Sequence, residues 1–145
     1  MTPNNLKLID KLNHIKHLFL LGKSDKNLDE KEIHIITQIA KHHGLNYKDI
    51  EYITSNFEEI PFSMPETFTE RLAALYDLVV LMVSDFKIHE REKKFCKDLA
   101  LKYEFNPQVI DELIEDVLSY VLDGKECNEV MDYLTKYAHP KPSLN

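Results

Sequence analysis

Apolar residues recur at intervals of three and four along most of this chain, a spacing that places them on one face of an α-helix. The first such stripe includes Leu12, Ile15 and Phe19, and it predicts a helix from about Asn5 to Leu21. Segments with alternating apolar and polar residues are few, and only three of the 145 residues are glycine. The pattern therefore predicts an all-α protein of about seven helices in a single bundle.

Residues that cap or break helices set the expected boundaries. Asn106 can accept hydrogen bonds from free backbone amides and Pro107 fits the first helical turn, so this pair predicts a helix start. The segment from Ile60 to Pro65 holds two prolines and is expected to be a packed connector. Further expected boundaries are helix starts near Asp29 and at Asn46, helix ends at Gly44 and Asp123-Gly124, a fourth helix over about 66–84 and a last helix over about 128–137.

Two stretches sixty residues apart share one pattern without any insertion. This register predicts a duplicated unit made of a helix, an acidic turn and two further helices. We expect the units at about 8–58 and 66–122, a final helix at 126–138, a single domain over 1–138 and a flexible tail over 139–145. The matched positions include Ser24 with Ser84, Asp25 with Asp85, Leu28 with Ile88, Glu30 with Glu90, Glu32 with Glu92, and Asn46 with Asn106.

The charge and the cysteines exclude several classes of protein. Eighteen basic residues against twenty-five acidic ones give a net charge of −7, so we expect no nucleic-acid partner. No segment approaches the ~20 apolar residues that span a bilayer, so we expect no membrane insertion and a cytoplasmic location. Cys96 and Cys127 lie far apart without a metal-ligand motif, so they are interpreted as reduced packing residues.

The segment from Leu81 to Glu92 resembles the signature of the TerB-like family, helical domains linked with tellurite resistance and also found attached to some J-domain proteins. That signature is an apolar helix ending in Ala-Asp-Gly, a short apolar step, and acidic residues that open the next helix. Asp85 matches the signature aspartate, Ile88 the apolar step, and Glu90 and Glu92 the acidic opening, whereas Ser84 and Phe86 replace the usual small residue and glycine. The similarity extends from about Leu8 to Tyr137.

The resemblance implies a pseudo-duplicated helical bundle that acts through protein partners in metal or chemical stress. It also implies divalent-cation binding at the acidic turns, and it implies no catalysis. Clustered carboxylate oxygens suit hard cations such as Ca²⁺ or Mg²⁺, and Zn²⁺ is also considered. The candidate metal ligands are Asp25, Asp29, Glu32, Asp85, Glu90 and Glu92.

Two alternatives compete with cation binding at these turns. The aspartates can close turns and the glutamates can complement helix dipoles without any ion. A small metal-dependent hydrolase using His89 and the nearby carboxylates is the alternative from another functional class. The other histidines considered, His14, His17 and the adjacent His42-His43, are interpreted as structural or solvated.

The function expected from the sequence is therefore a non-catalytic helical module for protein interaction, with cation binding as a regulatory input. No cofactor other than such a cation is expected. The partner remains unidentified, and homo-oligomers through the fourth or the last helix are a further alternative.

Overall fold

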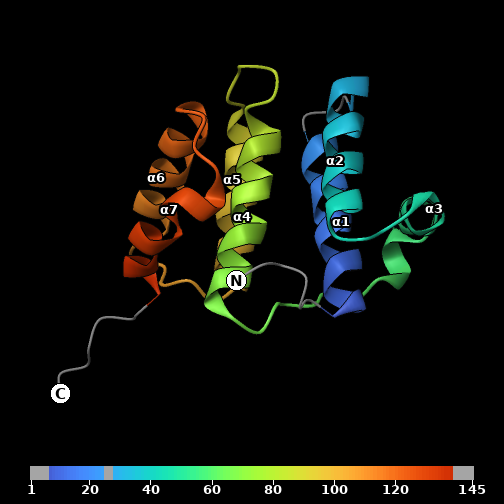
Figure 1. The fold of residues 1–145 in the computed structure, drawn as a ribbon, viewed down its shortest axis with the longest axis horizontal. Coiled ribbons are helices and arrows are strands. Elements are labelled where there is room, and N and C mark those ends of the chain that lie inside the picture. Colours follow the sequence, from blue (N-terminus) through green and yellow to red (C-terminus); the bar gives the residue numbers. More distant parts are fainter. Residues whose placement is uncertain (1–6, 25–27, 139–145) are drawn as a thin grey trace.

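The computed structural model of the protein describes residues 7–24 and 28–138, and these ranges contain helices and no strand. The predicted all-α fold is thus confirmed (Figure 1). None of the described helices is both long and apolar enough to span a bilayer. The elements are α1 (Leu8–Lys23), α2 (Glu30–His42), α3 (Tyr47–Ser55), η2 (Phe57–Glu59), α4 (Phe68–Met82), α5 (Glu90–Lys102), α6 (Ile110–Leu122), α7 (Cys127–Leu134) and η3 (Thr135–Tyr137).

Reciprocal capping boxes start several of these helices. At α2 the Asp29 side chain accepts a hydrogen bond from the Glu32 amide, and the Glu32 carboxylate accepts one from the Asp29 amide. Asn46 caps α3 in the same way with Asp49, so the predicted starts at Asp29 and Asn46 are confirmed. Each box satisfies amides that the first helical turn leaves without a partner. The predicted stops hold as well, because Gly44 and Gly124 have positive φ just beyond α2 and α6.

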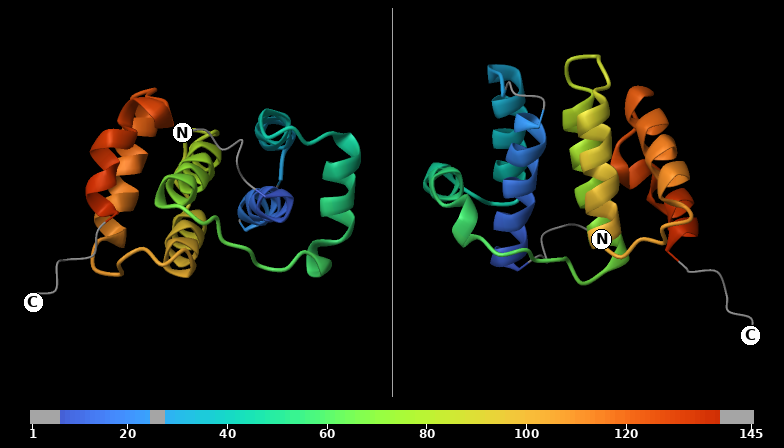
Figure 2. Two further views of the ribbon diagram at one scale, coloured as in Figure 1. Left: turned by 60° about the horizontal axis from the view of Figure 1, so that its bottom comes forward. Right: turned by 180° about the vertical axis from the view of Figure 1, so that it is seen from behind.

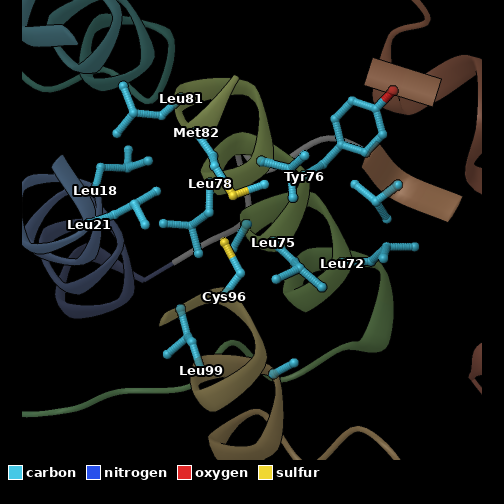
Figure 3. Close-up of a cluster of buried hydrophobic side chains, with 14 of the residues drawn as sticks. Leu18, Leu21, Leu72, Leu75, Tyr76, Leu78, Leu81, Met82, Cys96 and Leu99 are labelled. Atoms are coloured by element: carbon cyan, nitrogen blue, oxygen red, sulfur yellow. The ribbon is translucent and has the colours of Figure 1, made fainter. Parts of the chain in front are cut away.

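Helix α4 forms the centre of the bundle. It packs against α1, α2, α5, α6 and α7. Figures 1 and 2 show α1 and α2 on one side of it, α6 and α7 on the other, and α5 alongside. Figure 3 shows α4 leucines directed toward both α1 and α5. The fully buried leucines of α4 are Leu72, Leu75, Leu78 and Leu81. Their burial supplies much of the apolar contact that holds both sides of the bundle together.

Several predicted boundaries differ from the structure. Helix α1 begins at Leu8, not at about Asn5, because Lys7 before it has an extended backbone, and it ends at Lys23, not at Leu21. Helix α6 begins at Ile110, not at Asn106, because the Asn106 side chain accepts a hydrogen bond from the Gln108 amide and residues 107–109 form a turn. Helix α4 begins at Phe68, not at about 66, because Thr67 forms the capping box with Glu70. The last predicted helix ends as the 3₁₀ turn η3. The predicted tail over 139–145 lies outside the described residues.

The helix bounds bear on the predicted duplication. Helices α2 and α5 occupy positions sixty residues apart, and so do the first residues of α1 and α4. The third helices differ, since α3 has 9 residues and α6 has 13. The duplicated unit stays a prediction.

Candidate metal-binding site

The first acidic corner serves mainly as a helix start in the described residues. Asp25 lies outside them. The side chains of Asp29 and Glu32 form the capping box of α2, and Glu32 is buried. Glu30 is exposed at the first position of that helix, where a carboxylate complements the helix dipole.

The second acidic corner, residues 83–89, is held by Asp85. One of its carboxylate oxygens accepts a hydrogen bond from the Lys87 amide at 3.0 Å, and the other lies 3.1 Å from Nε2 of His89. Burial opposes ionisation of Asp85, but these hydrogen bonds outweigh it and hold its pKa below the usual value. Glu92 is buried one turn into α5 and Glu90 is exposed. Phe86 has a φ of 63°, a conformation that glycine adopts more readily.

Both corners lie at the same end of the bundle (Figure 1), and Lys31 Nζ sits 5.1 Å from the centre of the Phe86 ring. The described residues nevertheless bring no three of their carboxylates together as closely as metal ligands require. Asp29, Glu32 and Asp85 form hydrogen bonds with backbone amides, as the alternative in which these residues close turns and cap helices without an ion predicts. Cation binding at the corners stays a prediction, because Asp25 lies outside the described residues.

The structure places His89 at the residue before α5, beside Asp85. It lines neither the cavity beside His14 and Asp77 nor the one beside Tyr103 and Tyr137. A hydrolase centred on His89 needs a concave site with a third ligand, and the metal-ligand cluster found among residues 7–24 and 28–138 does not include His89. That hypothesis gains no support from the geometry.

A different set of residues converges near the C-terminal end of α2 and the start of α7. His14, His43 and Asp77 each offer one ligand atom, and these three atoms lie within 4.8 Å of one another. Nε2 of His14 lies 2.8 Å from Oδ2 of Asp77, and the two imidazole rings meet edge to face with centres 5.6 Å apart. Both histidines are buried and Asp77 is partly exposed.

Three helices position these side chains. His14 lies on the side of α1 that faces the core, next to the fully buried Ile15. Asp77 is the one carboxylate within the apolar run from Leu72 to Met82 of α4. His43 is the residue that ends α2, and its backbone amide donates to carbonyl oxygens of that helix. Helix packing therefore fixes all three backbones before any ligand arrives.

Electrostatics favour a neutral His43. Its pKa is lowered to about 4, mainly by burial and then by the neighbouring His14, while the Asp77 carboxylate opposes the shift only in part. A neutral imidazole is the form that binds metal. Nδ1 of His14 and Nδ1 of His43 are both buried without a hydrogen-bond partner. Burying such atoms costs stability.

The three residues line a cavity of about 430 Å³, hereafter the histidine pocket. Its other walls come from α4 and from the start of α7. Burial raises the pKa of the Cys127 thiol to about 12, and the Asp77 carboxylate adds to this effect. Further residues that line the pocket include Glu70, Tyr76, Lys125 and Cys127.

The sequence interpretation missed this site. It interpreted His14 and His43 as structural or solvated and did not consider Asp77. The signal present in the sequence was the single carboxylate inside the apolar run from Leu72 to Met82, since a charged group among buried residues needs a polar partner. Pairing it with His14 and His43 required the three-dimensional fold.

Comparison with known proteins adds no further assignment. No protein-family model matches the chain, and neither the curated proteins nor the solved structures contain a match. The TerB-like resemblance therefore stays a prediction that rests on the motif around Asp85.

Proposed function

We propose that this chain is a non-catalytic helical module that binds a divalent transition-metal ion in the histidine pocket. The observation that carries the proposal is the convergence of His14, His43 and Asp77, with their three ligand atoms within 4.8 Å of one another. Contacts with protein partners, as the TerB-like resemblance implies, are the expected output of the module.

The ligand chemistry selects the class of metal. Two imidazoles and one carboxylate suit Zn²⁺ and its first-row neighbours, whereas Ca²⁺ and Mg²⁺ prefer sites built from oxygen alone. The proposed ion therefore differs from the hard cation expected at the acidic corners, and so do its ligands. Of the three metals considered from the sequence, this site favours Zn²⁺.

Nε2 of His14 and Oδ2 of Asp77 lie 2.8 Å apart in a hydrogen bond. An ion held by both atoms would take the place of this hydrogen bond. His43 is already neutral at physiological pH, so it need not lose a proton before binding.

A structural ion pair is the competing explanation for His14 and Asp77. It accounts for these two residues but not for His43, whose buried Nδ1 has no hydrogen-bond partner. Keeping that imidazole beside the pair costs stability unless a ligand uses it. This difference makes His43 the residue to change in a test.

The test is a titration of chelator-treated protein with Zn²⁺, followed by calorimetry and by thermal unfolding. A ligand at about 100 times its Kd stabilises the folded state by about 2.7 kcal/mol, which corresponds to a Tm increase of roughly 5–10 °C for a chain of this size. Mg²⁺ is expected to leave the Tm unchanged.

Three variants locate the site. His43→Gln is expected to abolish the Zn²⁺ response, and the matched control His34→Gln, at an exposed position of the same helix, is expected to retain it. Asp85→Ala separates the pocket from the acidic corner and is expected to retain the response as well. A response that survives His43→Gln, or no response in the unmodified protein, would contradict the proposal.

A further inference from the structure

We infer that the metal in the histidine pocket binds a small monocarboxylate with an apolar body at its open coordination position. The inference rests on the proposed function and extends it by naming a ligand for the bound ion. Zinc takes four ligands, and a site with three protein ligands leaves the fourth position to water or to a bound molecule. The pocket lined by His14, His43 and Asp77 has the room and the walls for such a molecule.

The described residues supply three ligand atoms for the ion and leave one position open. Among residues 7–24 and 28–138, one group of three side chains with metal-binding atoms converges, and it consists of His14, His43 and Asp77. Further residues with metal-binding atoms line the same pocket without belonging to this group, namely His42, Glu126 and Cys127. An ion held by the group therefore keeps a position for a ligand other than these side chains.

The size of the pocket exceeds what a single water at the fourth position needs. Its volume is about 430 Å³, and pockets of about 300–1,000 Å³ are typical of small-molecule sites. Since all three proposed metal ligands line this cavity, an ion between them lies at its wall. A molecule bound to that ion would extend into the cavity.

The pocket walls next to Asp77 are apolar. Ala73 and Ala74 lie four and three residues before Asp77 on α4. Val80 lies three residues after Asp77, so these side chains share one face of the helix. All of them line the pocket, as does Met131 of α7. Ala73 and Val80 are only partly buried, which leaves apolar surface that a ligand can cover. The pocket therefore suits a molecule with one metal-binding group and an apolar body.

Charge selects a carboxylate as the metal-binding group. Two neutral imidazoles and the Asp77 carboxylate leave a bound Zn²⁺ with one positive charge in excess. A charge removed from water is costly unless it is paired, and a monoanion at the fourth position pairs it. A carboxylic acid is already ionised at neutral pH, so it binds without first losing a proton.

The other charged residues of the pocket leave the ion as the charge beside the open position. The buried Glu70 side chain accepts a hydrogen bond from the Thr67 amide in the capping box of α4. Glu126 and Lys125 are exposed to solvent, which screens their opposite charges. An anionic ligand therefore finds its partner in the metal.

Cobalt(II) is the probe for the ion, because it occupies zinc sites and its absorption spectrum changes when a ligand changes. Protein loaded with Co²⁺ in a buffer free of carboxylates is titrated with acetate, butyrate and hexanoate. Each should shift the visible bands, and the affinity should rise about fourfold for each methylene that the apolar walls cover. Hexan-1-ol has the same chain length without the charge and should leave the spectrum unchanged. Calorimetry should show that metal-free protein binds hexanoate at least about tenfold more weakly, because the carboxylate loses its partner.

The substitution Ala73→Leu tests the apolar walls. It adds an apolar side chain inside the pocket at a partly buried position. We expect it to keep Co²⁺ binding and the acetate response but to weaken hexanoate binding by at least about tenfold, which is the effect of roughly two methylenes. The matched control Val83→Leu lies just after α4, is partly buried and does not line the pocket, so it should keep the hexanoate affinity. Circular dichroism should show that both variants are folded.

Failure of the inference can be told apart from failure of the proposed function. Co²⁺ binding that depends on His43 but does not respond to any carboxylate would leave water as the fourth ligand. That result, equal affinities for acetate and hexanoate, or equal hexanoate binding without metal would overturn the inference and leave the proposed function standing. An absence of both Co²⁺ and Zn²⁺ binding would overturn both.

Discussion

His17 offers a quantitative test of how burial acts on a titratable group in this fold. Its side chain is buried, with its ring 6.0 Å from that of Phe62 and 6.4 Å from that of Tyr103. Burial lowers its pKa to about 3, and the nearby positive groups, Lys16 and Lys102 among them, act in the same direction.

The sign of the effect follows from the lowered pKa. An unfolded histidine binds a proton near pH 6.5, whereas folded His17 does so only near pH 3. Above pH 6.5 His17 is neutral in both the folded and the unfolded state, so it does not change the free energy of unfolding. As the pH falls from 6.5 toward the folded pKa, only the unfolded state takes up the proton, and the free energy of unfolding falls. Between about pH 7 and pH 5 this proton uptake lowers the free energy of unfolding by about 2 kcal/mol. His43, with a pKa of about 4, adds a loss of similar size.

Urea unfolding followed by circular dichroism, in the presence of a chelator, measures this loss at the two pH values. His17→Phe keeps an aromatic ring and removes the titration, so its loss between the two pH values should be smaller by about 2 kcal/mol. Comparing each variant with itself at two pH values cancels the change in packing. His34→Gln is the exposed control. If His17→Phe loses as much stability on acidification as the unmodified protein, His17 is protonated in the folded state and the reasoning is refuted.

Three further predictions concern stability and are checked by the same unfolding assay. Leu78→Ala should cost about 2–5 kcal/mol, because Leu78 is fully buried on α4 between the two sides of the bundle; a cost below that range would show that α4 is not the centre of the core. Phe86→Gly should be more stable than Phe86→Ala by about 1 kcal/mol, since both remove the ring but only glycine relieves the positive φ; equal stability would contradict the strain at that corner. His43→Leu should raise the stability of the metal-free protein by about 1 kcal/mol, because it removes a buried nitrogen without a partner, and it should lose the Zn²⁺ response; a large destabilisation would assign His43 a purely structural role.

Local signals in the sequence predicted the helices well. Asp29, Asn46, Gly44 and Gly124 act through backbone groups one to three residues away, so their effects can be read without knowing the fold. The start of α6 shows the limit of such reasoning. Asn106 can cap a helix or close a turn with Gln108, and both use the same carbonyl oxygen.

The candidate site could not be predicted in the same way. The acidic corners were predicted as metal sites because their carboxylates are close in sequence. The side chains of Asp29 and Glu32, however, accept hydrogen bonds from each other's backbone amides. His14, His43 and Asp77 come from three helices, and no local pattern joins them. Only the packing of α1 and α2 against α4 brings them together.

The hydrogen bond between His14 and Asp77 joins positions sixty-three residues apart, with one partner near the start of the described chain and the other in its central helix. A ribosome makes α1 and α2 well before α4, so a nascent chain cannot hold the pair until Asp77 has emerged. Any truncated product that ends before Asp77 lacks one of the three residues proposed to bind metal. Under the proposed function, only molecules synthesised past Asp77 could hold the ion.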